Sequence, residues 1–518
     1  MLKLMVMAKE GQSWAAGHLA NLYKGEGHDV FLYYFMPHEE HFKHSDFKTV
    51  PKEFGVRGEG CGDVARAFLA SRDSAYELID WDYIKHIEDN YCTDYLIGEQ
   101  VYSSQIFSSF WHYRDYHKRI DWYESLLILQ IYYQYVEALL DREQPDFILD
   151  TATEEYGRSI VYQVAKNRNI PYIVPEHTKL GEYHIPSFSF GMTTDPWFEE
   201  AYQKILNSEY SEKYEEATNF LIQYRNKDSV LNEDEKQYIK DNAHSFLGVV
   251  SRFLKHIYGF CRNNGVLSYL TPNRNRGIVS NPWKKLTFEF KYWMRLYFRP
   301  KMKNIFSVYD KSEKFILVPL HYLPESSTFL KSLDYFKEDI LLEWLVKKIP
   351  SNYVVFAKEH RSMIAERPAE YYKRLKSNGR IRVISPYEKT LNPEYFIKKT
   401  KAVITLTGTT ALEAAMLGKP AATLGVAPFS VIDSIAKLKS PGDVEEFVNN
   451  LEKHFPDEKQ VIAYIAAVME YGVKIKIYNI SRWYKFYNTS SSSDIIPLKR
   501  LFDLCIEGKH YACTTIEK

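Results

Sequence analysis

The stretch KAVITLTGTTALEAAMLGKPAATLG, residues 401–425, joins an apolar run, a glycine-centred loop and a helix-forming run that ends near Gly418. The apolar residues 402–406 predict a buried strand, Gly408 permits a tight turn, and residues 421–424 predict the next strand. A strand, a helix and a second strand in this order indicate a parallel sheet and an α/β fold.

The loop and first helical turn of this stretch carry hydroxyl groups and a carboxylate. Thr409 or Thr410 can cap the helix, and Glu413 lies at capping-box spacing from Thr410. The helix N-terminus also presents N–H groups and a positive dipole end, which attract anions. Two interpretations follow. Either the threonines, together with Thr407, bind phosphate while Glu413 contacts a ribose, or the pair only caps the helix.

Three strands upstream end in polar loops of the same kind. These predicted strands begin at residues 314, 352 and 381. Ligands of open parallel sheets bind just outside the carboxyl ends of the strands, so we expect one site at this edge. Its candidate residues are His321, Glu325, Lys358, His360, Ser385, Thr407, Gly408, Thr409, Thr410 and Glu413. For Lys358 and His360, a solvated loop is the alternative.

The N-terminal part of the chain has the pattern of a second α/β unit. Apolar runs at 2–8 and 30–35 flank a helical pattern, and two more strands are expected near 147–150 and 170–177, after a largely helical section at 62–145. Strand ends in this unit carry groups able to act as general bases. These are Glu154, Glu155, Glu176 and His177.

Composition excludes several classes of protein. The 518 residues are too many for one ordinary core, and 67 basic against 67 acidic residues give no field that favours nucleic acid. Five scattered cysteines predict no thiolate zinc site. The chain lacks Walker A, HExxH and GxSxG motifs. Without an apolar stretch approaching 18 residues, we expect a cytoplasmic protein.

These patterns predict a GT-B-like α/β fold, with two Rossmann-like domains facing a cleft and a helical linker region between them. The expected boundaries are 1–190 for the N-terminal domain with a helical insertion, 191–310 for the linker, 311–450 for the C-terminal domain, and 451–518 for helices and a tail. Within the linker, residues 283–303 interleave basic and aromatic side chains. They predict either peripheral contact with the inner face of the cytoplasmic membrane or a helix whose aromatics pack inward.

The motifs FILVPLHYLPESST (315–328), YVVFAKEHRSM (353–363) and residues 402–425 resemble, in this order, the C-terminal half of bacterial capsule and surface-polysaccharide glycosyltransferases. That group includes the capsular Kdo transferases and is distantly similar to bacterial sialyl- and polysialyltransferases. The resemblance implies that His360 and the hydroxyls of Thr407, Thr409 and Thr410 bind the nucleotide of a CMP-sugar. Arg361 stands where the relatives have proline, which weakens the inference of CMP.

The resemblance therefore implies a metal-independent glycosyltransferase, with a nucleotide-sugar donor as substrate, no cofactor, and a glycan or glycolipid acceptor. His321 and Glu325 would lie near the sugar, and the acceptor base would be Glu176 or His177, followed by Glu154 or Glu155. Two alternatives stay open: a non-hydrolysing sugar-nucleotide epimerase, and a non-catalytic carbohydrate-binding or assembly protein.

Overall fold

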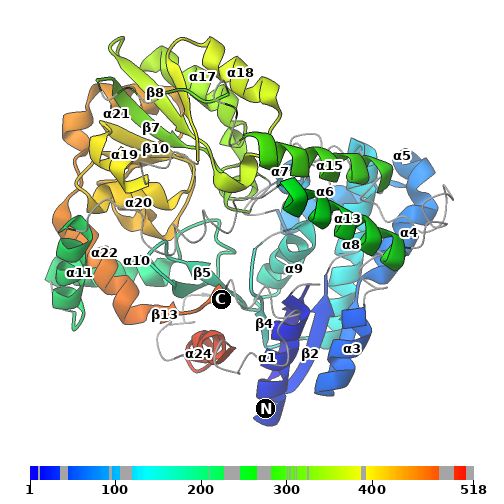
Figure 1. Cartoon of the computed structure of the whole chain (residues 1–518). Helices are drawn as coiled ribbons and strands as arrows, with labels where there is room; N and C mark the ends of the chain where they lie inside the picture. Colours follow the sequence, from blue (N-terminus) through cyan, green and yellow to red (C-terminus); the bar gives the residue numbers. More distant parts are fainter. Residues whose placement is uncertain are drawn as a thin grey trace.

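The computed structural model describes most of the chain. The described residues are 1–9, 12–35, 45–92, 96–104, 120–153, 155–208, 211–226, 246–264, 282–299, 302, 305–308, 310, 312–323, 326–386, 393–477 and 495–508. They form two β-sheets, each packed between helices (Figure 1). Within these ranges no helix combines the length and the hydropathy that crossing a bilayer requires.

The first sheet has seven strands in the order β13-β6-β5-β4-β1-β2-β3. Strands β1 to β5 are parallel, whereas β6 and β13 extend the sheet in antiparallel pairings. The strands are β1 (Lys3–Ala8), β2 (Asp29–Tyr34), β3 (Arg57–Gly60), β4 (Phe147–Leu149), β5 (Tyr172–His177), β6 (Tyr183–Ser187) and β13 (Val473–Lys474).

The second sheet has six parallel strands in the order β12-β11-β10-β7-β8-β9, the doubly wound order of a Rossmann domain. The α/β class and the two Rossmann-like domains expected from the sequence are confirmed. The strands are β7 (Lys314–Pro319), β8 (Tyr353–Lys358), β9 (Ile381–Ile384), β10 (Ala402–Thr405), β11 (Ala421–Thr423) and β12 (Ala436–Lys437).

Alternate residues of the central strands serve two separate cores. In β1, Met5 and Met7 pack on one face with helices α8 (Trp122–Glu143) and α9 (Tyr156–Asn167). Leu4 and Val6 pack on the other face with helix α1 (Ser13–Gly25). Strand β7 divides its side chains in the same way. Because helices cover both faces of each sheet, these strands have unbroken apolar sequences. These apolar runs are the pattern from which the strands are predicted.

The helices that follow the strands cover the two sheets. Those of the first half are α1 (Ser13–Gly25), α3 (Ser45–Phe54), α4 (Gly62–Ser71), α5 (Ala75–Leu78), α6 (Trp81–Asn90), α7 (Ile97–Ser103), α8 (Trp122–Glu143) and α9 (Tyr156–Asn167). Those of the second half are α16 (Ser326–Phe329), α17 (Glu338–Lys348), α18 (Ala369–Ser377), α19 (Pro393–Lys399), α20 (Thr409–Met416) and α21 (Pro441–Asn449).

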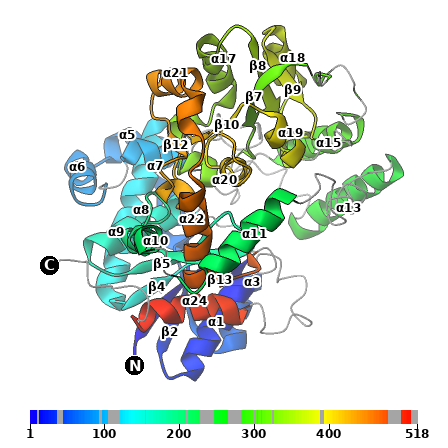
Figure 2. The same cartoon turned by 90° about the vertical axis from the view of Figure 1, so that its left-hand side faces the viewer.

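Among the described residues between the two sheets in sequence lie the helices α10 (Pro196–Ser208), α11 (Tyr214–Asn226), α13 (Phe246–Asn264) and α15 (Pro282–Phe298). After the second sheet, α22 (Glu458–Tyr471) leads the chain back to the first half, where β13 and α24 (Ile495–Ile506) lie (Figure 2). The Tyr23 hydroxyl bonds to Asp503 on α24 at 2.9 Å. The boundaries at 190, 310 and 450 stay predictions.

Candidate functional site

The second sheet reverses its strand order between β7 and β10, and two side chains meet at this point. His321 follows the carboxyl end of β7, and Thr405 is the last residue of β10. His321 Nε2 lies 3.1 Å from Thr405 Oγ1. Ligands of doubly wound sheets bind at this reversal, so the pair lies where the fold favours a site.

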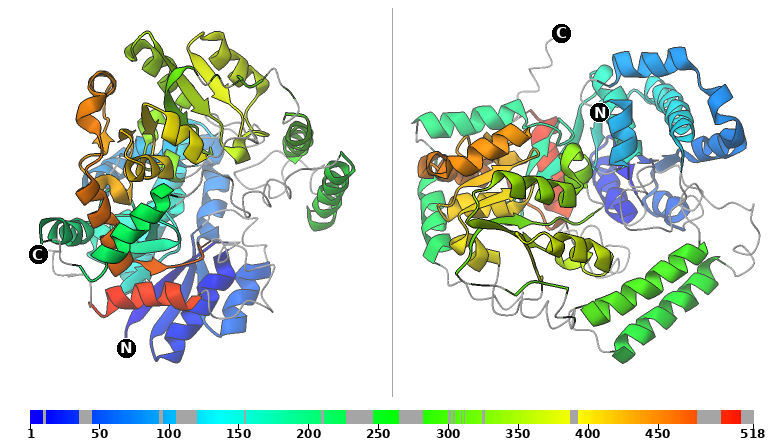
Figure 3. Two further views of the ribbon diagram at one scale, coloured as in Figure 1. Left: turned by 60° about the vertical axis from the view of Figure 1, so that its left-hand side comes forward. Right: turned by 90° about the horizontal axis from the view of Figure 1, so that it is seen from above.

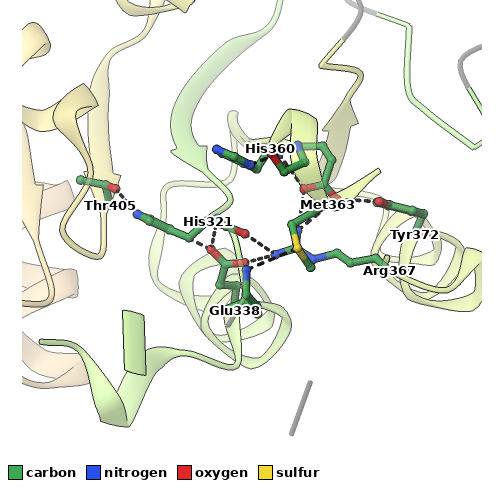
Figure 4. Close-up of polar contacts among 10 residues, drawn as sticks. His321, Glu338, His360, Met363, Arg367, Tyr372 and Thr405 are labelled. Carbon is green, nitrogen blue, oxygen red and sulfur yellow. Dashed lines mark hydrogen bonds and ion pairs between the residues drawn. The ribbon is translucent and has the colours of Figure 1, made fainter. Parts of the chain in front are cut away.

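Glu338, the first residue of α17, fixes the orientation of the His321 ring. Its Oε1 lies 2.6 Å from the backbone nitrogen of His321 and 2.9 Å from the ring Nδ1 (Figure 4). An ionised carboxylate only accepts, so we assign the ring proton to Nδ1. Nε2 then accepts a hydrogen bond from the Thr405 hydroxyl, and that oxygen accepts one from the N–H of Gly408 at 3.2 Å.

Arg367 is fully buried next to His321 and Glu338, and its guanidinium contacts two carboxylates. It forms ion pairs with Glu338 and with Glu359, whose two oxygens lie 2.8 and 3.0 Å from Nη1. Burial opposes the ionisation of Glu338, but Arg367 and His321 outweigh it and lower the pKa of that carboxyl. For Glu359, burial outweighs Arg367 and raises the pKa. The network supplies His321 with a charged partner held in place by packing.

His360 contributes a second imidazole to the same edge. Its Nδ1 accepts the N–H of Ser362 at 3.3 Å, which makes Nε2 the protonated nitrogen of the neutral ring. Desolvation, and then the nearby His321 and the positive charge of Arg367, lower its pKa to about 4, although the residue keeps an exposed edge. The ring is therefore a neutral hydrogen-bond donor at neutral pH. Figure 4 shows both imidazoles directed to the same side.

Helix α20 begins at Thr409, with Gly408 as its N-cap and without a side-chain bond at that cap, in the fully described segment 393–477. The capping-box interpretation is therefore wrong. The physical reason is that the extended backbone at Gly408 makes this residue the N-cap, so that Thr410 lies inside the helix and not at its cap. A Cβ at Gly408 would lie 2.6 Å from Thr405 Oγ1 and 3.2 Å from His321 Nε2. Thr409 and Thr410 are half-buried on the first turn, and Glu413 is half-buried at the start of the second.

The remaining candidates of the second half are less central. Thr407 is buried beneath the loop, and Ser385 is half-buried after β9. The ammonium of Lys358 lies 5.7 Å from the centre of the Phe396 ring, so this side chain packs over α19. Glu325 lies outside the described residues.

Glu176, at the end of β5 in the first half, reaches the second half through an ion pair with Lys331. Both side chains are nearly buried, with 12% and 9% of their surfaces exposed. The carbonyl of Lys331 accepts the N–H of Val426, in the loop after β11, at 3.3 Å. The carboxyl edges of the two sheets therefore approach each other at Glu176.

The other first-half candidates are placed differently. His177 uses both ring nitrogens within its own turn, where Nδ1 accepts the N–H of Lys179 at 3.1 Å and Nε2 lies 3.0 Å from the carbonyl of Gly181. Burial, then Lys179, lowers its pKa. Glu155 precedes α9 with a φ of 76°, a conformation that non-glycine residues adopt only under constraint. Glu154 lies outside the described residues.

The first sheet carries a polar network of its own where its order reverses, between β1 and β4. Gln12 Oε1 accepts from the Thr151 hydroxyl at 3.0 Å and from Arg158 at 2.9 Å. Arg158 is buried and pairs with Asp150 at 2.8 Å. This largely buried polar cluster lies at the carboxyl edge of the first sheet, beside β5, near whose end Glu176 lies.

Sequence reasoning missed Thr405, Glu338 and Arg367. Thr405 lies within the predicted strand 402–406, and the two charged residues lie 17 and 46 positions from His321. No local pattern marks such pairings. Among the described residues, no cluster of three or more His, Cys, Asp or Glu side chains has a metal-binding arrangement. Metal independence stays a prediction.

No protein-family model and no curated protein matches the chain. Among solved structures, the chain is similar to the Thermosulfurimonas dismutans KpsC β-Kdo 2,4 transferase, at 14% identity and a TM-score of 0.33, covering 65% of this chain and 88% of that one. The UDP-GlcNAc 2-epimerase from Neisseria meningitidis bound to UDP-GlcNAc is 13% identical, with a TM-score of 0.26 and coverage of 90% and 98%. The S. aureus MnaA–UDP co-structure is 14% identical, with a TM-score of 0.24 and coverage of 94% and 97%.

Proposed function

We propose that the chain is a glycosyltransferase that moves a sugar from a nucleotide-activated donor to a glycan or glycolipid acceptor. The observation that carries this proposal is the convergence of His321, Thr405 and the N-terminus of α20 at the strand-order reversal of the second sheet. The negatively charged phosphates of a nucleotide-sugar fit the carboxyl edge of the second sheet. The N–H groups of the helix and of the neutral imidazole donate hydrogen bonds, and such groups favour anions.

In this proposal the donor phosphates contact the backbone N–H groups and hydroxyls of Thr409 and Thr410. His360 donates from Nε2 without carrying charge, and Glu338 holds His321 in one orientation toward the same space. A site whose hydrogen-bond donors are already oriented needs no reorganisation when negative charge develops on the leaving phosphate. The sequence motifs suggest a CMP-sugar, with a UDP-sugar as the other candidate.

The acceptor base in this proposal is Glu176. Its carboxylate lies at the contact between the two carboxyl edges, where an acceptor hydroxyl can approach the donor sugar. Lys331 occupies this carboxylate, so the ion pair must open when the acceptor enters. The network of Gln12, Thr151 and Arg158 would present polar groups to the acceptor on the first-half side.

Calorimetric titration of the whole protein with CMP, UDP and GDP tests the donor site. We expect at least one nucleotide to bind, and Thr409→Ala with Thr410→Ala to weaken it by about tenfold, the effect of one or two lost hydrogen bonds. The unfolding free energy should change by less than about 1 kcal/mol, since neither hydroxyl caps α20. An unchanged dissociation constant would refute the phosphate assignment, and the absence of all nucleotide binding would refute the enzyme.

A sugar-nucleotide epimerase is the second candidate, and the His321–Glu338 pair favours it. A histidine oriented by a buried carboxylate is suited to moving a proton on the donor sugar itself. Incubation with UDP-sugars in D₂O, without acceptor, separates the two reactions. Deuterium in an epimerised sugar identifies the epimerase, whereas donor consumption only with an added glycan identifies the transferase.

A further inference from the structure

Helices α13 and α15 form an antiparallel pair at the outside of the molecule (Figure 3). The pairing is fixed by aromatic contacts: Phe246 lies 5.6 Å from Tyr297, and Phe253 lies 5.4 Å from Phe290, between ring centres. The order of these partners runs in opposite directions along the two helices, which makes the pair antiparallel.

The inner side of α15 is anchored to the second half. Arg295 donates to the carbonyl of Glu366 at 3.1 Å, and the buried Arg299 donates to the carbonyl of Ile364. Tyr292 packs against the core of the second domain. This part of the basic, aromatic segment 283–303 therefore packs inward, and α15 carries α13 on its other side.

The outer face of α13 is apolar and exposed. Leu247, Val250, Leu254 and Tyr258 expose 79%, 37%, 58% and 66% of their surfaces. Their spacing of three, four and four residues places all four on one side of the helix. An aligned row of large apolar side chains in water, unlike scattered ones, indicates a binding surface.

The sequence of this helical segment is strongly basic. Residues 246–303 contain twelve lysines and arginines and one acidic residue, Glu289, although the whole chain is neutral with 67 of each sign. Lys255 on α13 and Lys284 and Lys291 on α15 are exposed. A second copy of this chain would bring two positive surfaces together, which disfavours self-association.

We propose that the outer face of α13, with these lysines beside it, binds the surface of an anionic phospholipid bilayer. The helix lies in the plane of the interface, with Leu254 and Tyr258 inserted at the level of the acyl chains and the lysines against the headgroup phosphates. The proposal rests on α13 and α15 alone and does not depend on the reaction that the chain catalyses.

Sedimentation of the full-length protein with vesicles tests this surface. We expect binding to mixed phosphatidylcholine and phosphatidylglycerol vesicles, little binding to phosphatidylcholine alone, and loss of binding as salt is raised. Leu254→Glu with Tyr258→Glu should weaken binding by more than about tenfold, because the burial of both apolar side chains in the bilayer is lost. Ile222→Glu, at a half-exposed apolar residue of α11, is the matched control and should bind as the unchanged protein does.

Lys284→Glu with Lys291→Glu supplies a second variant, on α15, that removes charge without touching the apolar row. It should abolish the preference for anionic vesicles. Failure of the unchanged protein to sediment with anionic vesicles would overturn the proposal. Equal binding by the α13 variant, or a change from dimer to monomer by the same variant in size-exclusion chromatography, would overturn it as well.

Discussion

Glu338 accepts hydrogen bonds from both the backbone N–H and the ring N–H of His321, at 2.6 and 2.9 Å. The two bonds leave the imidazole no freedom to rotate, and they present its other nitrogen to Thr405. A single buried carboxylate therefore sets the position and the tautomer of the central histidine of the candidate site.

Glu338→Gln should lower both turnover and stability. The change removes one charge partner of the buried Arg367, and we expect a loss of about 3 kcal/mol in the free energy of unfolding, measured with urea. Glu343→Gln, at a partly exposed residue of the same helix, should change stability by less than about 0.5 kcal/mol. Equal stability of the two variants would contradict the role given to Glu338.

Gly408→Ala should disrupt the contact between Thr405 and His321. The added methyl group would lie within 2.6 Å of the threonine oxygen, so one of the two side chains must move. We expect nucleotide affinity to fall and stability to drop by roughly 1–3 kcal/mol. Gly379→Ala, where a Cβ meets no atom within 4 Å, is the control. If the Gly408 variant and the control both bind nucleotide with the affinity of the unchanged protein, the close approach of Gly408 to Thr405 has no role in binding.

Glu176→Gln and Lys331→Met should be coupled. Both groups are nearly buried, and each single change leaves an unpaired group at the contact between the halves. A double-mutant cycle in thermal or urea unfolding should give a coupling energy of about 1–3 kcal/mol. If Glu176 is the acceptor base, its variant loses turnover far more than the Lys331 variant does. Similar turnover losses in the two variants would assign the pair to domain contact alone.

His184 should make the protein less stable in mild acid. Burial, then the nearby His177, lowers its pKa from 6.5 to about 4 in the folded chain. Below pH 6.5 the unfolded chain therefore binds a proton that the folded chain excludes, and stability falls as pH drops toward 4. This residue accounts for up to about 3 kcal/mol of that loss. Unfolding curves of His184→Gln should show a flatter pH dependence, and parallel curves would contradict the assignment.

The central strands could be predicted because both of their faces are buried. Residues 315–318 and 402–405 are unbroken apolar or threonine runs, and each corresponds to a strand. The edge strands β3 and β13 were not predicted, since RGEG at 57–60 is polar and residues 473–474 pair only through tertiary contact. Burial on one side or none leaves too weak a pattern to detect.

The position of the candidate site, at the carboxyl edge of the second sheet, was predicted, but the hydrogen-bond network around His321 was not. The strand ends placed His321, His360 and the loop at Gly408 together, because parallel strands share one carboxyl edge. The partners of His321 were not predictable, since Glu338 and Arg367 reach it through helix packing. The threonines resembled caps because capping residues and phosphate ligands share the same hydroxyl chemistry.

The return of the chain to the first sheet has a consequence for biosynthesis. Strand β13 pairs with β6, which lies nearly three hundred residues earlier in the sequence, and α24 packs against α1, which lies nearly five hundred residues earlier. During translation, the amino-terminal Rossmann unit leaves the ribosome long before its last strand and covering helix do. Until β13 and α24 are synthesised, one edge of the first sheet and one of its apolar faces stay exposed. Nascent chains of this protein are therefore expected to depend on chaperones that hold such intermediates.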